Sequence, residues 1–111
     1  MKLTERPPPP KLEGVRRPAH VARMLALAHH LQRALDQGRV ANRAELARRL
    51  GFTQTRITQV LDLLWLAPDI QEALLHFEAV DGREPLGERQ LRDVVHIESW
   101  EEQREAWRPR S

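Results

Sequence analysis

The chain has 111 residues, 41% of them hydrophobic, and carries 18 Lys and Arg against 16 Asp and Glu, a formal net charge of +2. This length fits one domain with a single modest core, and the absence of cysteine excludes a disulfide framework and a thiolate metal site. No apolar run approaches the roughly 20 residues that cross a bilayer, and residues 1–20 lack the apolar segment of a secretory signal. We therefore expect a cytoplasmic protein with no membrane partner.

The charge is divided unevenly along the chain. Residues 1–60 contain 12 Lys or Arg against 4 Asp or Glu, whereas residues 61–111 contain 6 against 12. Such a division predicts that the first half meets a polyanion. Arg supplies 16 of the 18 cations, which favours bidentate contacts with phosphate or guanine, although a GC-rich genome also enriches Arg.

Residues 1–18 are expected to form a flexible, disordered basic arm, with Pro7 to Pro10 in polyproline conformation. One interpretation is an inert solvated leader. The other is an arm that follows phosphates or enters a minor groove, with Arg16 and Arg17 as phosphate contacts.

The remainder, residues 19–111, is predicted to be a compact all-α domain without any strand. A long helix begins at Ala19 and ends before Gly38, because apolar residues recur on one helical face: Val21, Met24, Leu25, Ala28, Leu31 and Leu35. His29 and His30 are adjacent and point about 100° apart, so they cannot hold one metal ion together, and no metal site is expected.

Two short helices, 43–50 and 54–66, follow and form a predicted helix-turn-helix unit, residues 43–66. The unit needs a small residue where the helices cross, which Ala47 supplies, and a turn residue at positive φ, which Gly51 supplies. Thr53 is the expected N-cap of the second helix. Five apolar positions are expected to face inward: Leu46, Leu50, Phe52, Ile57 and Val60.

With those residues inward, the first two turns of the second helix expose a short, neutral, hydrogen-bonding patch. These turns enter the major groove in DNA-binding helix pairs, where Gln pairs with adenine and Thr meets base edges. The expected base contacts are Thr53, Gln54, Thr55, Thr58 and Gln59. The expected phosphate contacts are Arg43, Arg48, Arg49 and Arg56, the last of which could equally reach a base.

Pro68 and Asp69 open the next predicted helix, residues 81–87 are a loop by composition, and two acidic helices occupy residues 88–108. Ser99 and Glu102 have the spacing of a capping box. Trp100 and Trp107 lie two turns apart on one face, where they either pack onto their own domain or form a partner interface. Trp65 is expected in the core.

The segment "AELARRLGFTQTRITQVLDLLWLAPDIQEALL" resembles the helix-turn-helix portion of the ParB/KorB family of DNA-binding proteins. The resemblance covers about residues 41–80 and implies sequence-specific binding of duplex DNA by Thr53 to Gln59. Leu-Ala-Pro stands where the family has Leu-Pro, and Asp62 stands where it has a basic residue. The segments "APDIQEALL", "GREPLGERQLR" and "WEEQREAW" resemble small proteins encoded beside serine recombinases on bacterial mobile elements.

We therefore expect a bacterial, nucleoid-associated DNA-binding protein that acts as a transcriptional regulator or as an accessory factor of a recombinase. Its expected partners are double-stranded DNA, with a homodimer partner and a serine recombinase as further candidates. The alternative is an adaptor that docks a partner through its Trp-bearing C-terminal helix. No nucleophile–base or phosphate-cradling arrangement is present, so no enzymatic activity and no cofactor are expected. RNA binding stays open, although aromatic residues for stacking on bases are missing from the patch.

Overall fold

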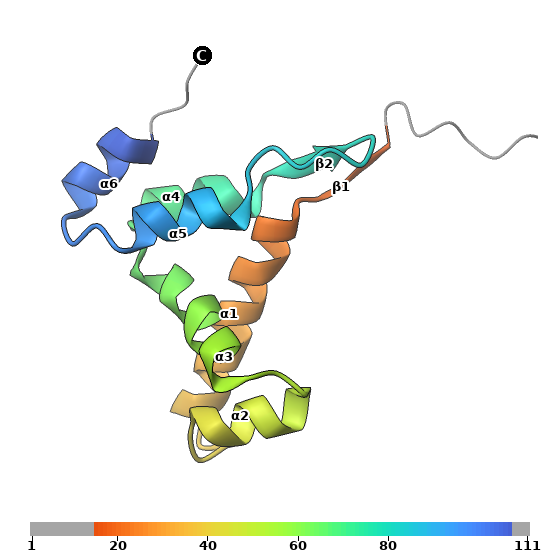
Figure 1. Ribbon diagram of the computed structural model, residues 1–111, viewed down its shortest axis with the longest axis vertical. Helices are drawn as coiled ribbons and strands as arrows, with labels where there is room; N and C mark the ends of the chain where they lie inside the picture. The colour runs from red at the N-terminus through yellow and green to blue at the C-terminus, as the bar shows by residue number, and fades with distance from the viewer. Residues whose placement is uncertain (1–14, 108–111) are drawn as a thin grey trace, which may run out of the picture.

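A computed structural model describes residues 15–107 of the chain. In Figure 1, helix α1 forms a stem; two helices, α2 and α3, lie at its far end, and the remaining helices and a short β-ribbon form a layer across its near end. The elements, in chain order, are β1 Arg16–Pro18, α1 His20–Asp36, α2 Arg43–Leu50, α3 Gln54–Leu61, the 3₁₀ helix η2 Asp62–Trp65, α4 Pro68–Leu75, β2 Glu78–Val80, α5 Glu88–Val95 and α6 Trp100–Trp107.

Helix α1 is the axis of the core. Its apolar face has the predicted helical spacing, and Val21, Leu25, Ala28 and Leu31 are buried, while Met24 and Leu35 are half-buried and pack against that core. The helix ends where predicted, since Gly38 adopts φ 72°. The mostly helical class predicted from the sequence is thus confirmed.

The expectation of no strand was wrong. Strands β1 and β2 pair in antiparallel register, with Arg17 opposite Ala79. A two-residue turn follows β2, with Asp81 and Gly82 at φ 55° and 79°. Each strand has three residues, which is too short for an alternating pattern to be recognised in the sequence. The ribbon also shortens the predicted arm, because residues 15–18 belong to the folded unit; residues 1–14 lie outside the described residues.

Helices α2 and α3 are joined by a tight turn. Gly51 adopts the predicted positive φ, 71°, and the Phe52 amide donates to the Ala47 carbonyl at 2.9 Å. Leu46, Ala47, Ile57 and Val60 are buried as expected. Two of the predicted inward residues are not buried, because Leu50 ends α2 and Phe52 lies in the turn itself: they are 43% and 38% exposed.

The opposite layer contains α4, α5 and α6. Pro68 begins α4 as predicted, and the Ser99 hydroxyl accepts from the Glu102 amide at 3.3 Å. Gln103 is the buried polar residue among the described residues: its Oε1 accepts from the Ala67 amide at 2.8 Å, and its Nε2 donates to the carbonyls of Trp65 and Ile97. The bonds to Trp65 and Ala67 attach α6 to the end of η2 and to the residue before α4.

Trp65 was predicted to be in the core, yet 68% of the residue is exposed. The predicted helix 54–66 is α-helical only to Leu61 and continues as η2. A 3₁₀ helix has 3.0 residues per turn instead of 3.6, so its last residues point in different directions from those of a continued α-helix. Within residues 15–107, no helix has the length and apolar character required to span a membrane.

Candidate functional site

The neutral patch predicted on α3 lies at the surface. Thr53, Gln54, Thr55 and Thr58 are exposed, and Gln59 is half-buried. Burial of Ile57, Val60 and Leu61 against the rest of the core fixes the rotation of α3 about its axis, because these residues occupy the opposite face. The first two turns of α3 therefore present uncharged hydrogen-bonding groups to solvent.

Thr53 has a defined local role. Its hydroxyl accepts a hydrogen bond from the Arg56 amide at 3.0 Å, so it caps α3 as predicted. Since this hydroxyl is already used, Thr53 is less available to a base edge than Gln54, Thr55 and Thr58, whose side chains have no hydrogen bond within the described residues.

Helix α2 carries the exposed cations beside this patch. Arg43, Arg48 and Arg49 are exposed, and Arg49 donates to Glu45 one turn earlier at 2.7 Å. The pKa of the Glu45 carboxyl is lowered, first by the hydrogen bond from the Ala41 amide and then by that from Arg49. Arg43 and Arg48 have no ion-pair partner among residues 15–107.

Arg56 is half-buried beside the patch, and its guanidinium also donates to Gln59 at 3.5 Å. Its guanidinium makes a bidentate pair with Glu88 of α5, at 2.5 and 2.9 Å, and also contacts the sulfur of Met24. The hydrogen bonds from Arg56, first, and from His20 lower the pKa of Glu88 to about 2 against the effect of burial. The structure thus gives Arg56, an expected DNA contact, an internal partner 32 residues away that no local pattern revealed.

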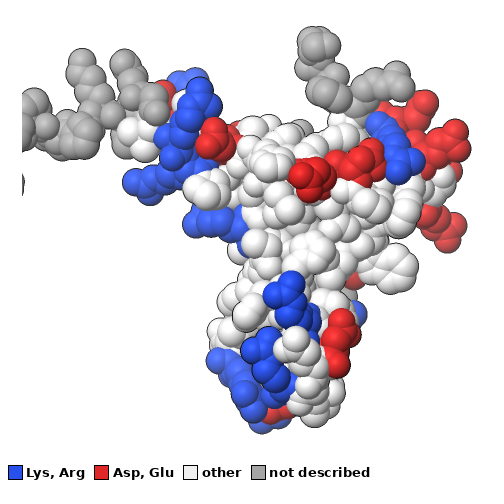
Figure 2. Space-filling view, turned by 180° about the vertical axis from the view of Figure 1, so that it is seen from behind, with Lys and Arg blue, Asp and Glu red and all other residues white. Residues whose placement is uncertain are grey.

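The other predicted phosphate contacts, Arg16 and Arg17, lie on β1 and are exposed. Arg16 pairs with Glu78 of β2 at 3.2 Å. Arg83, beside the turn of the ribbon, is also exposed and was not singled out from the sequence. In Figure 2, Lys and Arg side chains gather at the ribbon and at the far end of the stem, whereas Asp and Glu gather at the α6 end.

The two tryptophans of α6 face different surroundings. Trp107 stacks on Phe77, with ring centroids 5.6 Å apart and planes inclined by 24°. Trp100 is 49% exposed, and its indole nitrogen donates to the Trp65 carbonyl at 3.2 Å. They do not form one aromatic stripe, because one packs on its own domain and the other stays largely in solvent.

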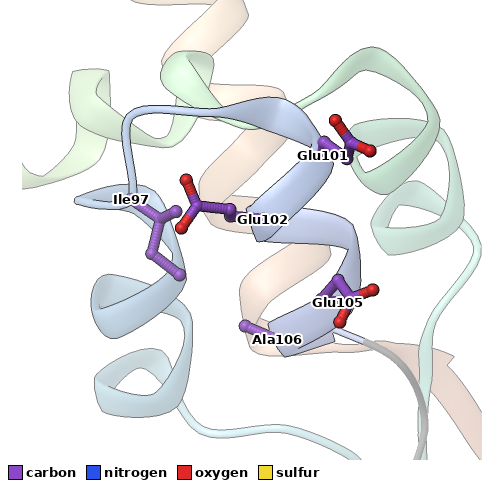
Figure 3. Close-up of a pocket in the computed structure, with 5 residues that line it drawn as sticks. All are labelled: Ile97, Glu101, Glu102, Glu105 and Ala106. Atoms are coloured by element: carbon purple, nitrogen blue, oxygen red, sulfur yellow. The ribbon is translucent and has the colours of Figure 1, made fainter.

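The acidic face of α6 borders a shallow hollow of about 570 Å³. Figure 3 shows Glu102 directed toward Ile97, while Glu101 and Glu105 lie on the other side of the helix, away from Glu102. The three carboxylates therefore do not converge. Among the described residues, no group of three or more His, Cys, Asp or Glu side chains could hold a metal ion.

Comparisons with protein-family models, with curated proteins and with solved structures found no match to this chain.

Proposed function

We propose that this protein binds double-stranded DNA in a sequence-specific manner, with α2 and α3 acting as a helix-turn-helix. The observation that supports it most is the exposed, uncharged Thr and Gln patch on the first two turns of α3. Solvation alone favours Glu and Lys on an exposed helix. Exposed Arg residues flank the patch, and the acidic surface lies at the other end of the molecule (Figure 2).

Each group has a separate role in this proposal. Thr55 and Gln59 lie one turn apart on the side of α3 opposite Ile57, and with Gln54 and Thr58 they read base edges in the major groove. Thr53 caps the helix, and the first amides of α3 offer a phosphate contact. Arg56 orients α3 through Glu88 and is not assigned to a base.

The cations supply contacts with phosphates. Arg43 and Arg48 are available as they stand, whereas Arg49 must exchange its bond to Glu45 for one to a phosphate. Arg17 offers a second phosphate contact from the ribbon, and Arg16 offers another if it exchanges its bond to Glu78 for one to a phosphate. For each phosphate neutralised, the plot of the logarithm of the binding constant against the logarithm of the salt concentration becomes steeper by about 0.9.

The recognition assignment is tested by selecting bound duplexes from a random DNA pool and measuring affinity for the selected site and for unrelated duplexes. Gln54→Ala with Thr55→Ala is expected to reduce the preference for the selected site by about tenfold or more, since a good bidentate base contact contributes about 1–3 kcal/mol of discrimination. Weak, salt-sensitive binding should persist.

The matched control is Glu72→Ala with His76→Ala, which removes two exposed polar side chains, one from α4 and one from the residue that follows it, and should leave the preference unchanged. If the Gln54/Thr55 variant discriminates between duplexes as well as the unchanged protein, the base-reading role of α3 is wrong. A palindromic selected site would indicate binding as a homodimer.

The physiological role proposed is transcriptional regulation or assistance to a mobile-element recombinase, in the nucleoid of a bacterial cytoplasm. The proposed physiological role is based on the sequence resemblances alone. The alternative, an adaptor without DNA recognition, is favoured by the exposure of Trp100 but not by Trp107, which packs inward. Loss of a recombinase from a pull-down with Trp100→Ala, with DNA binding intact, would support the adaptor.

A further inference from the structure

Trp65 and Trp100 form an exposed aromatic face at the end of the molecule opposite the ribbon. They are 68% and 49% exposed, and they line a hollow of about 510 Å³ together with Asp62, Val95, His96, Ile97 and Glu98. Large aromatic rings in solvent contribute little to folding, so an exposed pair of them beside a hollow indicates a binding surface.

The backbone beneath this face is fixed. The Trp65 carbonyl accepts two hydrogen bonds, from the Trp100 indole and from the amide of the buried Gln103, both at 3.2 Å. The hydrogen bond from its indole N–H therefore orients the Trp100 ring. The backbone of Trp65 is held in place by the two bonds to its carbonyl. A surface held in this way loses little conformational freedom when a ligand binds.

The chemistry of the face defines its ligand. Flat indole rings bind proline-rich segments in polyproline conformation, which are already extended and lose little entropy on binding. The carboxylates of Asp62 and Glu98 at the hollow, with Glu101 next to Trp100, favour a ligand with cations at its ends. The preferred ligand is thus a short proline run between basic residues.

The chain itself contains such a segment outside the described residues. Residues 6–11 read Arg-Pro-Pro-Pro-Pro-Lys, four prolines with a cation at each end. A segment of six residues in polyproline conformation spans about 15 Å at 3.1 Å per residue. Both the ring stacking and the charge of the Trp65–Trp100 face are therefore matched.

The position of the ribbon, at the end of the layer opposite α6, favours a segment from another molecule. Lys11 is four residues before Val15, whose carbonyl accepts from the Asp81 amide at the ribbon, so Lys11 extends at most about 14 Å from it. In Figure 1 the ribbon and α6 lie at opposite ends of the layer, with α4 and α5 between them. We propose that the Trp65–Trp100 face binds residues 6–11 of a second copy of this chain.

Nuclear magnetic resonance of the three indole N–H groups in the full chain tests this inference. On raising the protein concentration, the signals of Trp65 and Trp100 should shift, while that of Trp107, stacked on Phe77, should stay in place as an internal control. Replacing Pro7 to Pro10 with serine should abolish these shifts, and a peptide of residues 4–13 added to that variant should restore them.

Substitutions on the other side of the contact complete the test. Trp65→Ala should weaken peptide binding to the four-serine variant by tenfold or more. The control is Leu75→Ala, which removes an apolar side chain at the end of α4 and should not weaken binding; Leu75 is 42% exposed. Concentration-dependent shifts that persist in the four-serine variant would show that Trp faces pair with each other and would overturn the proposal. Absence of any shift, or a peptide that does not bind, would overturn it as well. None of these outcomes depends on DNA binding.

Discussion

The pair between Arg56 and Glu88 links α3 to α5, and the substitution Glu88→Gln measures how much this link contributes to the stability of the fold. The side chains keep 30% and 19% exposure, and the hydrogen bonds from Arg56 and, to a smaller extent, from His20 lower the pKa of Glu88 from 4.5 to about 2. A shift of this size corresponds to roughly 3 kcal/mol at 1.36 kcal/mol per unit. Because both side chains retain contact with water, which screens the charges, we expect Glu88→Gln to lower the free energy of unfolding at pH 7 by about 2 kcal/mol.

The pH dependence has a defined sign. The pKa of Glu88 is lowered by folding, so the folded state gains its stability above the unfolded value of 4.5 and loses it as the pH falls toward about 2. The difference between the unchanged protein and Glu88→Gln should therefore be largest at neutral pH, shrink below pH 4.5 and vanish near pH 2.

Urea unfolding followed by circular dichroism at several pH values measures this difference. Arg56→Gln and the double variant complete a cycle that separates the Arg56–Glu88 pair from the bond of Glu88 to His20 and from the effect of Glu88 on the first turn of α5. Asp69→Asn is the control, since its pair with Arg104 is exposed, and it should cost less than Glu88→Gln. A difference for Glu88→Gln that is the same at pH 7 and pH 2.5 would refute the reasoning.

Three further substitutions test the local structure by the same unfolding measurement. Gly51→Ala should cost about 1 kcal/mol, because φ is 71° and the added Cβ meets no atom within 4 Å; a loss several times larger would mean that a clash was overlooked. Thr53→Ala should cost about 1 kcal/mol while Thr53→Ser stays near the unchanged protein, and equal losses would count against the cap. Trp107→Ala should cost about 2 kcal/mol or more, as expected for a partly buried stacked ring, while Trp65→Ala changes stability by less than about 0.5 kcal/mol. The reverse order would contradict the assignment of the two rings.

The sequence predicted the elements whose signals are local. The bounds 43–50 and the start of α3 at residue 54 agree with the structure, because Gly51 and Thr53 mark the turn and the cap through their own backbone and side-chain chemistry. The spacing of apolar residues likewise located the buried face of α1.

What the sequence did not reveal depends on contacts between distant residues. The ribbon pairs Arg17 with Ala79, and neither strand is long enough to be recognised alone. The partner of Arg56 lies on α5, so the sequence could not show that this guanidinium is paired within the domain. The exposure of Trp65 follows from the change to 3₁₀ winding, which the leucine-rich run Leu63–Leu64 does not indicate.

The buried Gln103 gives α6 a positional constraint that apolar packing lacks. Leucine side chains can slide past one another and still pack. The amide group of Gln103 must instead bond to the Ala67 N–H and to the carbonyls of Trp65 and Ile97, and it can do so at only one position of the helix. Sliding α6 by one turn would leave the buried Ala67 amide without its hydrogen-bond partner. Gln103 therefore fixes the register of α6, because this helix can pack on the domain with its hydrogen bonds made in only one position.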